Sequence, residues 1–146
     1  MTTEATTGAT SAGRRTGGCL CGAVRYETPW PPLLTGVCHC RHCQKQAGTA
    51  FSVLVAVPFA SLERTGELTT YEDGSDSGNP VLRKFCGKCG SPVFSETPDG
   101  MAQGMIFIKA GTLDEVNDLA PTLHFWTSSA QPWVPIPEGA HKLAAQ

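Results

Sequence analysis

The chain has 146 residues, enough for one domain with a substantial hydrophobic core, so folding does not have to depend on disulfides. Its 11 Lys and Arg stand against 13 Asp and Glu, and the resulting net charge of −2 argues against a general nucleic-acid surface. No apolar run approaches the roughly 18 residues of a membrane span, so we expect neither nucleic acid nor a membrane as a partner.

The N-terminal segment 1–16 is rich in Thr, Ala and Gly and has no apolar stretch of the kind found in secretory signals. This composition predicts a disordered tail. Arg14 and Arg15 resemble part of a twin-arginine signal, but no apolar segment follows them. We therefore expect a cytoplasmic, reducing location, a folded domain over 17–137 and a short C-terminal tail over 138–146.

Most of the folded segment has the pattern of short β-strands. In chain order, strands are predicted from "CGAVRYET" (21–28), "FSVLVAVP" (51–58), "GELTTYE" (66–72), "PVLRKF" (80–85), "SPVFSE" (91–96) and "MIFIKAG" (105–111). The turn-rich "DGSDSGNP" separates the third and fourth strands, and "TPDG" follows the fifth as a turn. With 11 prolines and 16 glycines spread between short strands, we expect a mostly β domain of coiled antiparallel sheets.

Helical signals are few. Residues 40–47 predict a short helix, because Gly48 stands where helices favour a glycine for ending. A second helix is predicted at "TLDEVND" (112–118), with Thr112 as N-cap and Glu115 three residues later. The C-terminal "HFWTSSAQPWVPIPEG" (124–139) is too rich in proline for regular structure, and we expect it to lie across the surface.

Seven cysteines cannot form a complete set of internal disulfides, and clustered thiols in a reducing compartment favour a metal site. In "CGKCG", Cys86 and Cys89 have the spacing of a zinc knuckle, and the glycines permit its tight turn. Cys19 and Cys21, on a strand, would point to the same face. Together these two pairs make a complete four-cysteine zinc site that closes a long loop and stabilises the fold.

The remaining three cysteines, Cys38, Cys40 and Cys43, lie where a strand turns into a helix. Three protein ligands with an open fourth position are the arrangement of catalytic zinc. The positive end of the helix, with Arg41 and Lys45 nearby, would favour thiolates. His39 and His42 are possible ligands, although we expect exposed histidines that flank the metal loop.

A different division of the cysteines is also open. Cys40 and Cys43 could join Cys86 and Cys89 in a four-cysteine zinc ribbon, which would leave Cys19, Cys21 and Cys38 over. A single zinc with some spare thiols is a third possibility. Motif shape favours the first division.

Four motifs together resemble the GFA-like family, named for a glutathione-dependent formaldehyde-activating enzyme and including a centromere-protein branch. The motifs are "GGCLCGAVRY", "CHCRHCQKQAGTAF", "FCGKCGSPVF" and "WTSSAQPWV", from about Gly17 to about Pro135. The resemblance implies a fold shared with methionine-R-sulfoxide reductases and a small guanine-nucleotide-exchange chaperone. It also implies two Zn²⁺ per chain. Structural zinc ligands would be Cys19, Cys21, Cys86 and Cys89, and catalytic zinc ligands would be Cys38, Cys40 and Cys43.

The activity implied by this resemblance is that of a carbon–sulfur lyase, which joins glutathione and formaldehyde as S-hydroxymethylglutathione. A zinc held by three thiolates carries net negative charge, so delivery of a thiolate is favoured over Lewis-acid activation of the aldehyde. Lys109, together with Arg41 and Lys45 above, is a candidate for the carboxylates of glutathione, but solvated surface charges are expected. Trp126 and Trp133 could wall a pocket or pack at the surface.

Two other functions compete with the lyase. A sulfoxide reductase needs a metal-free nucleophilic cysteine, and the motifs leave no isolated cysteine for this role. A non-catalytic zinc-binding module for protein interaction stays open, with Cys38, Cys40 and Cys43 as a second structural zinc site. The substrate-binding residues and the oligomeric state are not determined by the sequence.

Overall fold

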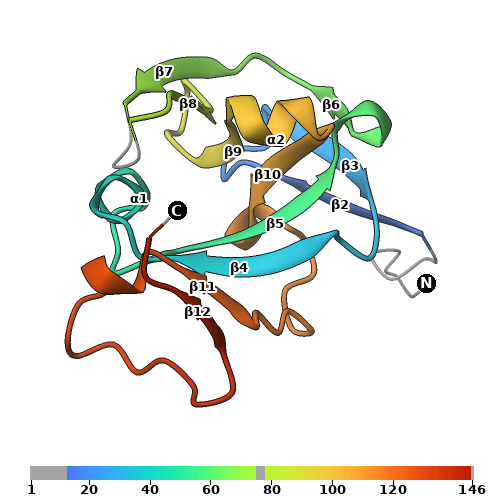
Figure 1. Ribbon diagram of the computed structural model, residues 1–146. Coiled ribbons are helices and arrows are strands. Elements are labelled where there is room, and N and C mark those ends of the chain that lie inside the picture. The colour runs from blue at the N-terminus through green and yellow to red at the C-terminus, as the bar shows by residue number, and fades with distance from the viewer. Residues whose placement is uncertain (1–12, 75–77, 146) are drawn as a thin grey trace.

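The computed structural model describes residues 13–74 and 78–145, which form two β-sheets and a few short helices (Figure 1). The larger sheet has eight strands in the order β12-β11-β4-β5-β10-β9-β8-β7, and the smaller has three in the order β2-β3-β6. A mostly β fold is therefore confirmed. Pairing is antiparallel except for β11, which runs parallel to both β4 and β12.

The larger sheet consists of β4 (Leu34–Cys38), β5 (Ser52–Pro58), β7 (Thr69–Asp73), β8 (Val81–Phe85), β9 (Pro92–Glu96), β10 (Met105–Lys109), β11 (Leu123–Phe125) and β12 (His141–Leu143). The smaller sheet consists of β2 (Arg14–Gly18), β3 (Arg25–Pro29) and β6 (Glu63–Thr65). The helices are α1 (Arg41–Ala47) and α2 (Pro98–Ala102), with single 3₁₀ turns at Phe59–Ser61, Ala110–Thr112 and Thr127–Ser129.

The two faces of the larger sheet have different partners. Residues that alternate along a strand point to opposite faces, and residues directly opposite on neighbouring strands share a face. Val55, Val57, Ile106 and Ile108 share the face that packs against the smaller sheet, and all four are fully buried. Tyr26 of β3 completes this core with an edge-on contact to a phenylalanine of β9 at 5.3 Å between ring centroids.

The opposite face of the larger sheet carries a different set of residues. Leu54 lies opposite Lys109, and Phe107 lies opposite both Ala56 and Ser95. This alternation explains why β5 and β10 appear as continuous apolar runs in the sequence, because their residues are covered on both faces of the sheet. The second face is where the candidate site lies.

Helix α1 follows β4 closely, as the sequence predicts. Cys40 is its N-cap, with an extended backbone and a sulfur that accepts a hydrogen bond from the backbone N–H of Cys43. Gly48 ends the helix with φ of 72°, a left-handed conformation that favours glycine. The helix thus ends where Gly48 predicts, and it begins one residue after the predicted start at Cys40.

Several local predictions were wrong. Residues 112–118 form no α-helix, because Thr112 ends a 3₁₀ turn and Leu113 bridges to Gly17 of β2. The predicted turn at 97–100 is the start of α2, with Thr97 as N-cap and Pro98 in the first turn. In residues 112–118, the bridge between Leu113 and Gly17 replaces the helix that the local sequence predicts.

The chain ends also differ from expectation. Residues 1–12 of the predicted tail lie outside the described residues, whereas Arg14 to Thr16 already belong to β2. The C-terminal segment is not entirely irregular, because β11 inserts between β4 and β12. This insertion needs Gly36, where a Cβ atom would lie 2.8 Å from the ring of Phe125. No helix in the described part of the chain is both long and apolar enough to cross a membrane.

Candidate active site

The seven cysteines gather in two separate clusters. In each cluster the sulfur atoms all lie within 4.8 Å of one another, close enough for one metal ion. The four-sulfur cluster consists of Cys19, Cys21, Cys86 and Cys89, and the three-sulfur cluster consists of Cys38, Cys40 and Cys43. The structure therefore confirms the predicted groups of four and three cysteines. It does not bring Cys40 and Cys43 together with Cys86 and Cys89, as a zinc ribbon would require.

The four-sulfur cluster joins two turns that are far apart in sequence. Cys19 and Cys21 lie in the turn between β2 and β3, not on a strand as predicted, and their sulfurs are 3.7 Å apart. The sulfur of Cys21 is 3.8 Å from that of Cys86, in the turn between β8 and β9. A metal ion here would tie the smaller sheet to the larger one.

The environment of the four-sulfur cluster favours a thiolate at Cys89. The backbone N–H of Val24 donates to the Cys19 sulfur at 3.2 Å, and that of Lys88 donates to the Cys86 sulfur at 3.4 Å. Hydrogen bonds with the side chain and backbone of Ser91 lower the pKa of Cys89 to about 5. A hydrogen bond with the backbone of Ala23 lowers the pKa of Cys21, but desolvation and the three neighbouring thiols outweigh it and raise this pKa to about 11. The four sulfurs together are the soft donor set that zinc prefers.

The three-sulfur cluster comes from one short stretch of chain. Cys38 ends β4, Cys40 caps α1 and Cys43 lies in its first turn, where its backbone N–H donates to the Cys40 sulfur at 3.2 Å. All three side chains are buried. A strand that ends two residues before a helix cap is enough to turn three sulfurs toward one point.

Two buried cations lie beside the three sulfurs. Arg83 of β8, with a side chain only 3% exposed, approaches the Cys43 sulfur with both terminal nitrogens, at 3.9 and 4.0 Å. Its Nε donates to Asp73 Oδ2 at 2.8 Å. Lys109 of β10 is also buried, and its Nζ donates to Ser52 Oγ at 2.8 Å. The cluster is therefore built into a positively charged wall.

These charges shift the ionisation of the site. Hydrogen bonds from the thiols of Cys38 and Cys40 lower the pKa of Cys43, and the charges of Lys109 and Arg83 lower it further. Burial lowers the pKa of Lys109, against the attraction of the cysteine sulfurs. Burial would also lower the pKa of Arg83, but its ion pair with Asp73 and its contact with Cys43 raise it. Lys109 and Arg83 thus favour a thiolate at Cys43.

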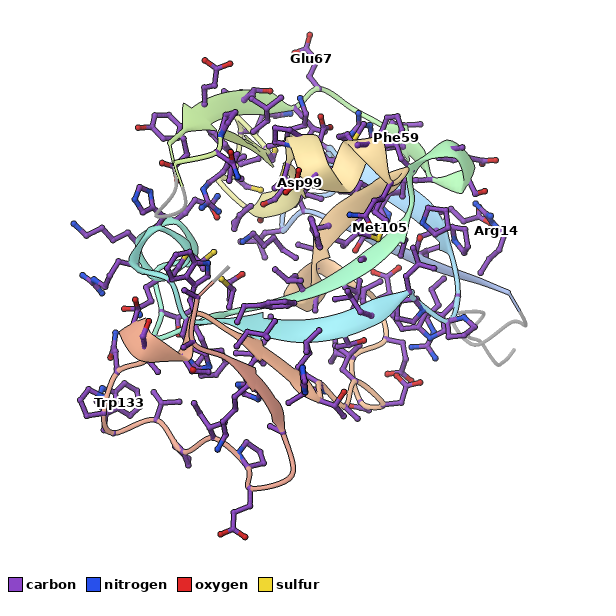
Figure 2. All side chains as sticks on the ribbon, in the orientation of Figure 1. Arg14, Phe59, Glu67, Asp99, Met105 and Trp133 are labelled. Atoms are coloured by element: carbon purple, nitrogen blue, oxygen red, sulfur yellow. The ribbon has the colours of Figure 1, made fainter. Side chains whose placement is uncertain are left out.

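The three-sulfur cluster opens into a pocket of about 450 Å³ on the second face of the larger sheet. The residues that line it on the α1 side are Cys38, Cys40, Cys43, Arg83 and Lys109. On the α2 side they include Asp99, on α2, and Met105, at the start of β10, both labelled in Figure 2. The size lies in the range of about 300–1,000 Å³ that small-molecule sites occupy.

The structure places some of the other candidate residues in the pocket and the rest at the surface. Arg41 and Lys45 are exposed on α1 and do not line the pocket. Lys109 does line it, but from a buried position and not as the expected surface charge. Trp126 lines the pocket with a left-handed backbone at φ of 58°, whereas Trp133 is 72% exposed on the C-terminal loop (Figure 2).

The two histidines near the cysteines are not alike. His42 is partly exposed and lies 2.8 Å from Asp73. His39, expected to be exposed, is fully buried, and its Nε2 lies 2.9 Å from Nδ1 of the buried His124. Neither belongs to a sulfur cluster. The parallel strand β11, which the sequence did not predict, is what buries His39.

Sequence reasoning missed Arg83 and Asp73. Arg83 and Lys84 are adjacent basic residues on one strand, so alternation puts one on each face. Arg83 pairs with Ser95 on the pocket face, whereas Lys84 donates to Thr70 at the exposed surface. The sequence contains both residues, but only the register of β8 against β9 shows which one reaches the sulfurs.

A family model described as glutathione-dependent formaldehyde-activating enzyme, abbreviated GFA, matches residues 14–129, well over half of the chain. The chain belongs to the GFA family. The matched segment of this GFA-family protein contains both sulfur clusters and the wall formed by Arg83 and Lys109. The resemblance seen in the four sequence motifs is thereby confirmed.

The fold of the GFA-family chain also has a counterpart among solved structures. A crystal structure of a Rhodobacter sphaeroides protein is similar, with a TM-score of 0.55 and 22% sequence identity. The similarity covers 70% of this chain and 91% of that one. At this level of identity the likeness concerns the fold alone.

Proposed function

We propose that this protein is a zinc-dependent carbon–sulfur lyase that catalyses the reversible joining of a thiol and formaldehyde, or a related small aldehyde. The observation that carries the proposal is the placement of Cys38, Cys40 and Cys43, three buried sulfurs within 4.8 Å of one another that line a pocket beside two buried cations. The family description supplies glutathione and formaldehyde as the first substrates to test.

In this proposal the two clusters have different roles. The four-sulfur cluster holds a structural zinc, because four thiolates complete a tetrahedral site. Cys38, Cys40 and Cys43 would hold a second zinc, and the chemistry that this ion would supply is ionisation of a substrate thiol near neutral pH. The segment 17–137, together with Arg14–Thr16 of β2 and with strand β12, acts as one domain, in a cytoplasmic setting where glutathione is available.

The reaction is balanced without an oxidant or a reductant. The substrate sulfur forms a bond to the aldehyde carbon, the π electrons of the carbonyl move to its oxygen, and that oxygen takes up the proton that the thiol has released. The reverse reaction breaks the same carbon–sulfur bond. The ammonium of Lys109 and the guanidinium of Arg83 supply positive charge that favours both the thiolate and the developing oxyanion.

Lys109 also offsets the net charge that the three-sulfur cluster would have with a zinc ion. A zinc ion with three thiolates has one net negative charge, which would oppose the approach of a fourth thiolate. Arg83 is balanced by Asp73 at 2.8 Å, so Lys109 provides the positive charge that offsets the centre. The approach of an anionic sulfur is then not opposed by net charge.

Exchange spectroscopy at equilibrium tests the proposal. Glutathione and formaldehyde combine without an enzyme, so the measured quantity is the exchange rate in excess of this background. Zinc-loaded protein should increase exchange in both directions equally, and Cys43→Ser should give no excess. If zinc-loaded wild-type protein leaves exchange of every thiol tested at background, the lyase proposal fails and a non-catalytic zinc-binding module for protein interaction takes its place.

A further inference from the structure

The charges of the pocket are separated along its length. Among the described residues that line it, the cations are Arg83 and Lys109, and both lie beside the three-sulfur cluster. The carboxylate among these lining residues is Asp99, in the first turn of α2. The α2 side therefore presents a negative charge to a bound molecule.

The two cations are already engaged. Arg83 contacts Asp73 and the Cys43 sulfur, and its side chain is 3% exposed. Lys109 is buried and donates to Ser52 Oγ. A carboxylate of a ligand could reach them only by competing with the sulfurs and Asp73 for the same positive charges.

The wall between the sulfurs and α2 is mostly apolar, although the uncharged polar residues Asn79, Ser95, Thr97 and Gln103 also line the pocket. It is formed by Leu34, Leu54, Met105, Phe107, Phe125 and Trp126. Leu54, Phe125 and Trp126 also pack around the three cysteines as one hydrophobic cluster. A substrate with its sulfur at the cysteines must lay its remaining atoms against this apolar surface.

Glutathione fits this surface poorly. It carries two carboxylates, and burying a charged group is strongly unfavourable unless it is paired with an opposite charge as well as hydrogen-bonded. Away from the sulfurs, the described lining residues supply uncharged polar groups but no cation. The pocket offers Asp99 on the α2 side, which would repel a carboxylate there. An uncharged apolar body would instead gain about 25 cal/mol for each Å² that it removes from water.

We infer that the site prefers thiols, and thiol–aldehyde adducts, whose body is uncharged and apolar, such as aryl-alkyl thiols, over glutathione. This inference rests on the proposed function, since it names the substrate class of the same site. The sulfur lies at the three-sulfur cluster, and the apolar body lies over Leu54 and Phe107 toward α2.

A binding experiment tests the inference without catalysis. Methyl thioethers cannot react with an alkylating agent as thiols do, so phenethyl methyl sulfide and S-methylglutathione serve as matched probes. Alkylation of Cys38, Cys40 and Cys43 by iodoacetamide is followed by peptide mass spectrometry in metal-free and zinc-loaded protein. We expect half-protection at a concentration of phenethyl methyl sulfide at least tenfold lower than that of S-methylglutathione. Equal or better protection by S-methylglutathione overturns the inference.

The exchange assay is a second test of the preference for apolar thiols. Glutathione, glutathione diethyl ester and 2-phenylethanethiol are compared with formaldehyde at equal thiolate concentrations. The ester has the peptide and thiol of glutathione but no free carboxylates, so it isolates the effect of charge. We expect the catalysed excess to rise at least tenfold from glutathione to 2-phenylethanethiol, with the ester between them. A catalysed excess that is largest for glutathione overturns the inference but leaves the lyase proposal intact.

Two neighbouring leucines give a matched pair of variants. Leu34 lines the pocket, whereas Leu33 is 57% exposed and does not. Leu34→Arg adds a cation to the apolar wall and should improve protection by S-methylglutathione about tenfold, while Leu33→Arg should not. If Leu34→Arg does not fold, Asp99→Lys changes the charge at an exposed pocket position and should act in the same direction. No gain from either pocket variant contradicts the inference.

If every thiol stays at background in the exchange assay, the lyase proposal fails, and the protection assay still decides what the pocket binds. The two proposals can therefore fail separately.

Discussion

The four-sulfur and three-sulfur clusters use the same donor atom, yet they are built in opposite ways. Cys21 and Cys86, whose sulfurs are 3.8 Å apart, are separated by 65 positions, so the first cluster exists only when two distant turns meet. Cys38 to Cys43 is one short stretch that ends a strand and starts a helix. Metal binding at the first cluster is therefore coupled to folding, whereas binding at the second is coupled to one local bend.

The clusters also differ in what surrounds them. Cys21 is exposed and Cys89 is partly exposed, so solvent reaches the four-sulfur cluster directly. The three-sulfur cluster is buried, faces a pocket and touches Arg83. A site that only has to hold two sheets together needs no pocket or matched charge, and these are the features that make the second cluster a candidate for chemistry.

The largest expected difference between the clusters is in folding. Cys86→Ser removes a ligand whose metal binding is worth on the order of 10 kcal/mol in structural zinc sites, about as much as the whole stability of a typical domain. We expect insoluble or unfolded protein. Cys43→Ser should keep the circular dichroism spectrum and shift the melting temperature by only a few degrees. Soluble, folded Cys86→Ser beside unfolded Cys43→Ser would reverse the assignment of the two sites.

Metal removal should distinguish the clusters next. We expect two zinc ions per chain by elemental analysis, and a mild chelator should remove one of them while the protein stays folded. The ion in the three-sulfur cluster has fewer protein ligands and faces a pocket, so it should be the one that leaves. A single zinc that comes off only on unfolding would show that the three-sulfur cluster does not hold a resident ion.

The charged wall gives a smaller effect that is confined to one cluster. Lys109→Met removes a positive charge beside the three sulfurs and keeps much of the side-chain volume. We expect zinc affinity at the three-sulfur cluster to fall about tenfold, which corresponds to about 1.4 kcal/mol. The four-sulfur cluster should be unaffected. Competition with a chromophoric chelator measures both sites, and Lys84→Met, which removes a charge outside the pocket, is the matched control.

The smallest effect concerns the acidity of Cys89 in metal-free protein. Its pKa is lowered to about 5 by hydrogen bonding with Ser91, so the thiolate persists down to that pH. An ordinary thiol with a pKa near 8.5 loses about tenfold in alkylation rate for each pH unit below it. The alkylation rate of Cys89 should therefore stay nearly constant from pH 8 to about pH 6 and fall below about pH 5. Ser91→Ala, which removes the side-chain hydrogen bond and keeps the backbone one, should move this fall in rate to a higher pH.

Local signals in the sequence determined the parts of the molecule that are themselves local. Gly48 predicts the end of α1, because that end depends on backbone hydrogen bonds within a few residues. The spacing of Cys38, Cys40 and Cys43 predicts one cluster for the same reason. The motif shapes also favoured the division of the cysteines that the structure shows, although the zinc-ribbon division has equally regular spacing.

The tertiary structure alone decided what stands around the sulfurs. Strand register put Arg83 rather than Lys84 on the pocket face, and it turned Lys109 from an expected surface charge into a buried neighbour of Cys43. The parallel insertion of β11 buried His39 and placed Phe125 over Gly36. A shift by one residue exchanges the two faces of a strand, so pairing between distant segments, which no local pattern encodes, fixes which side chains meet.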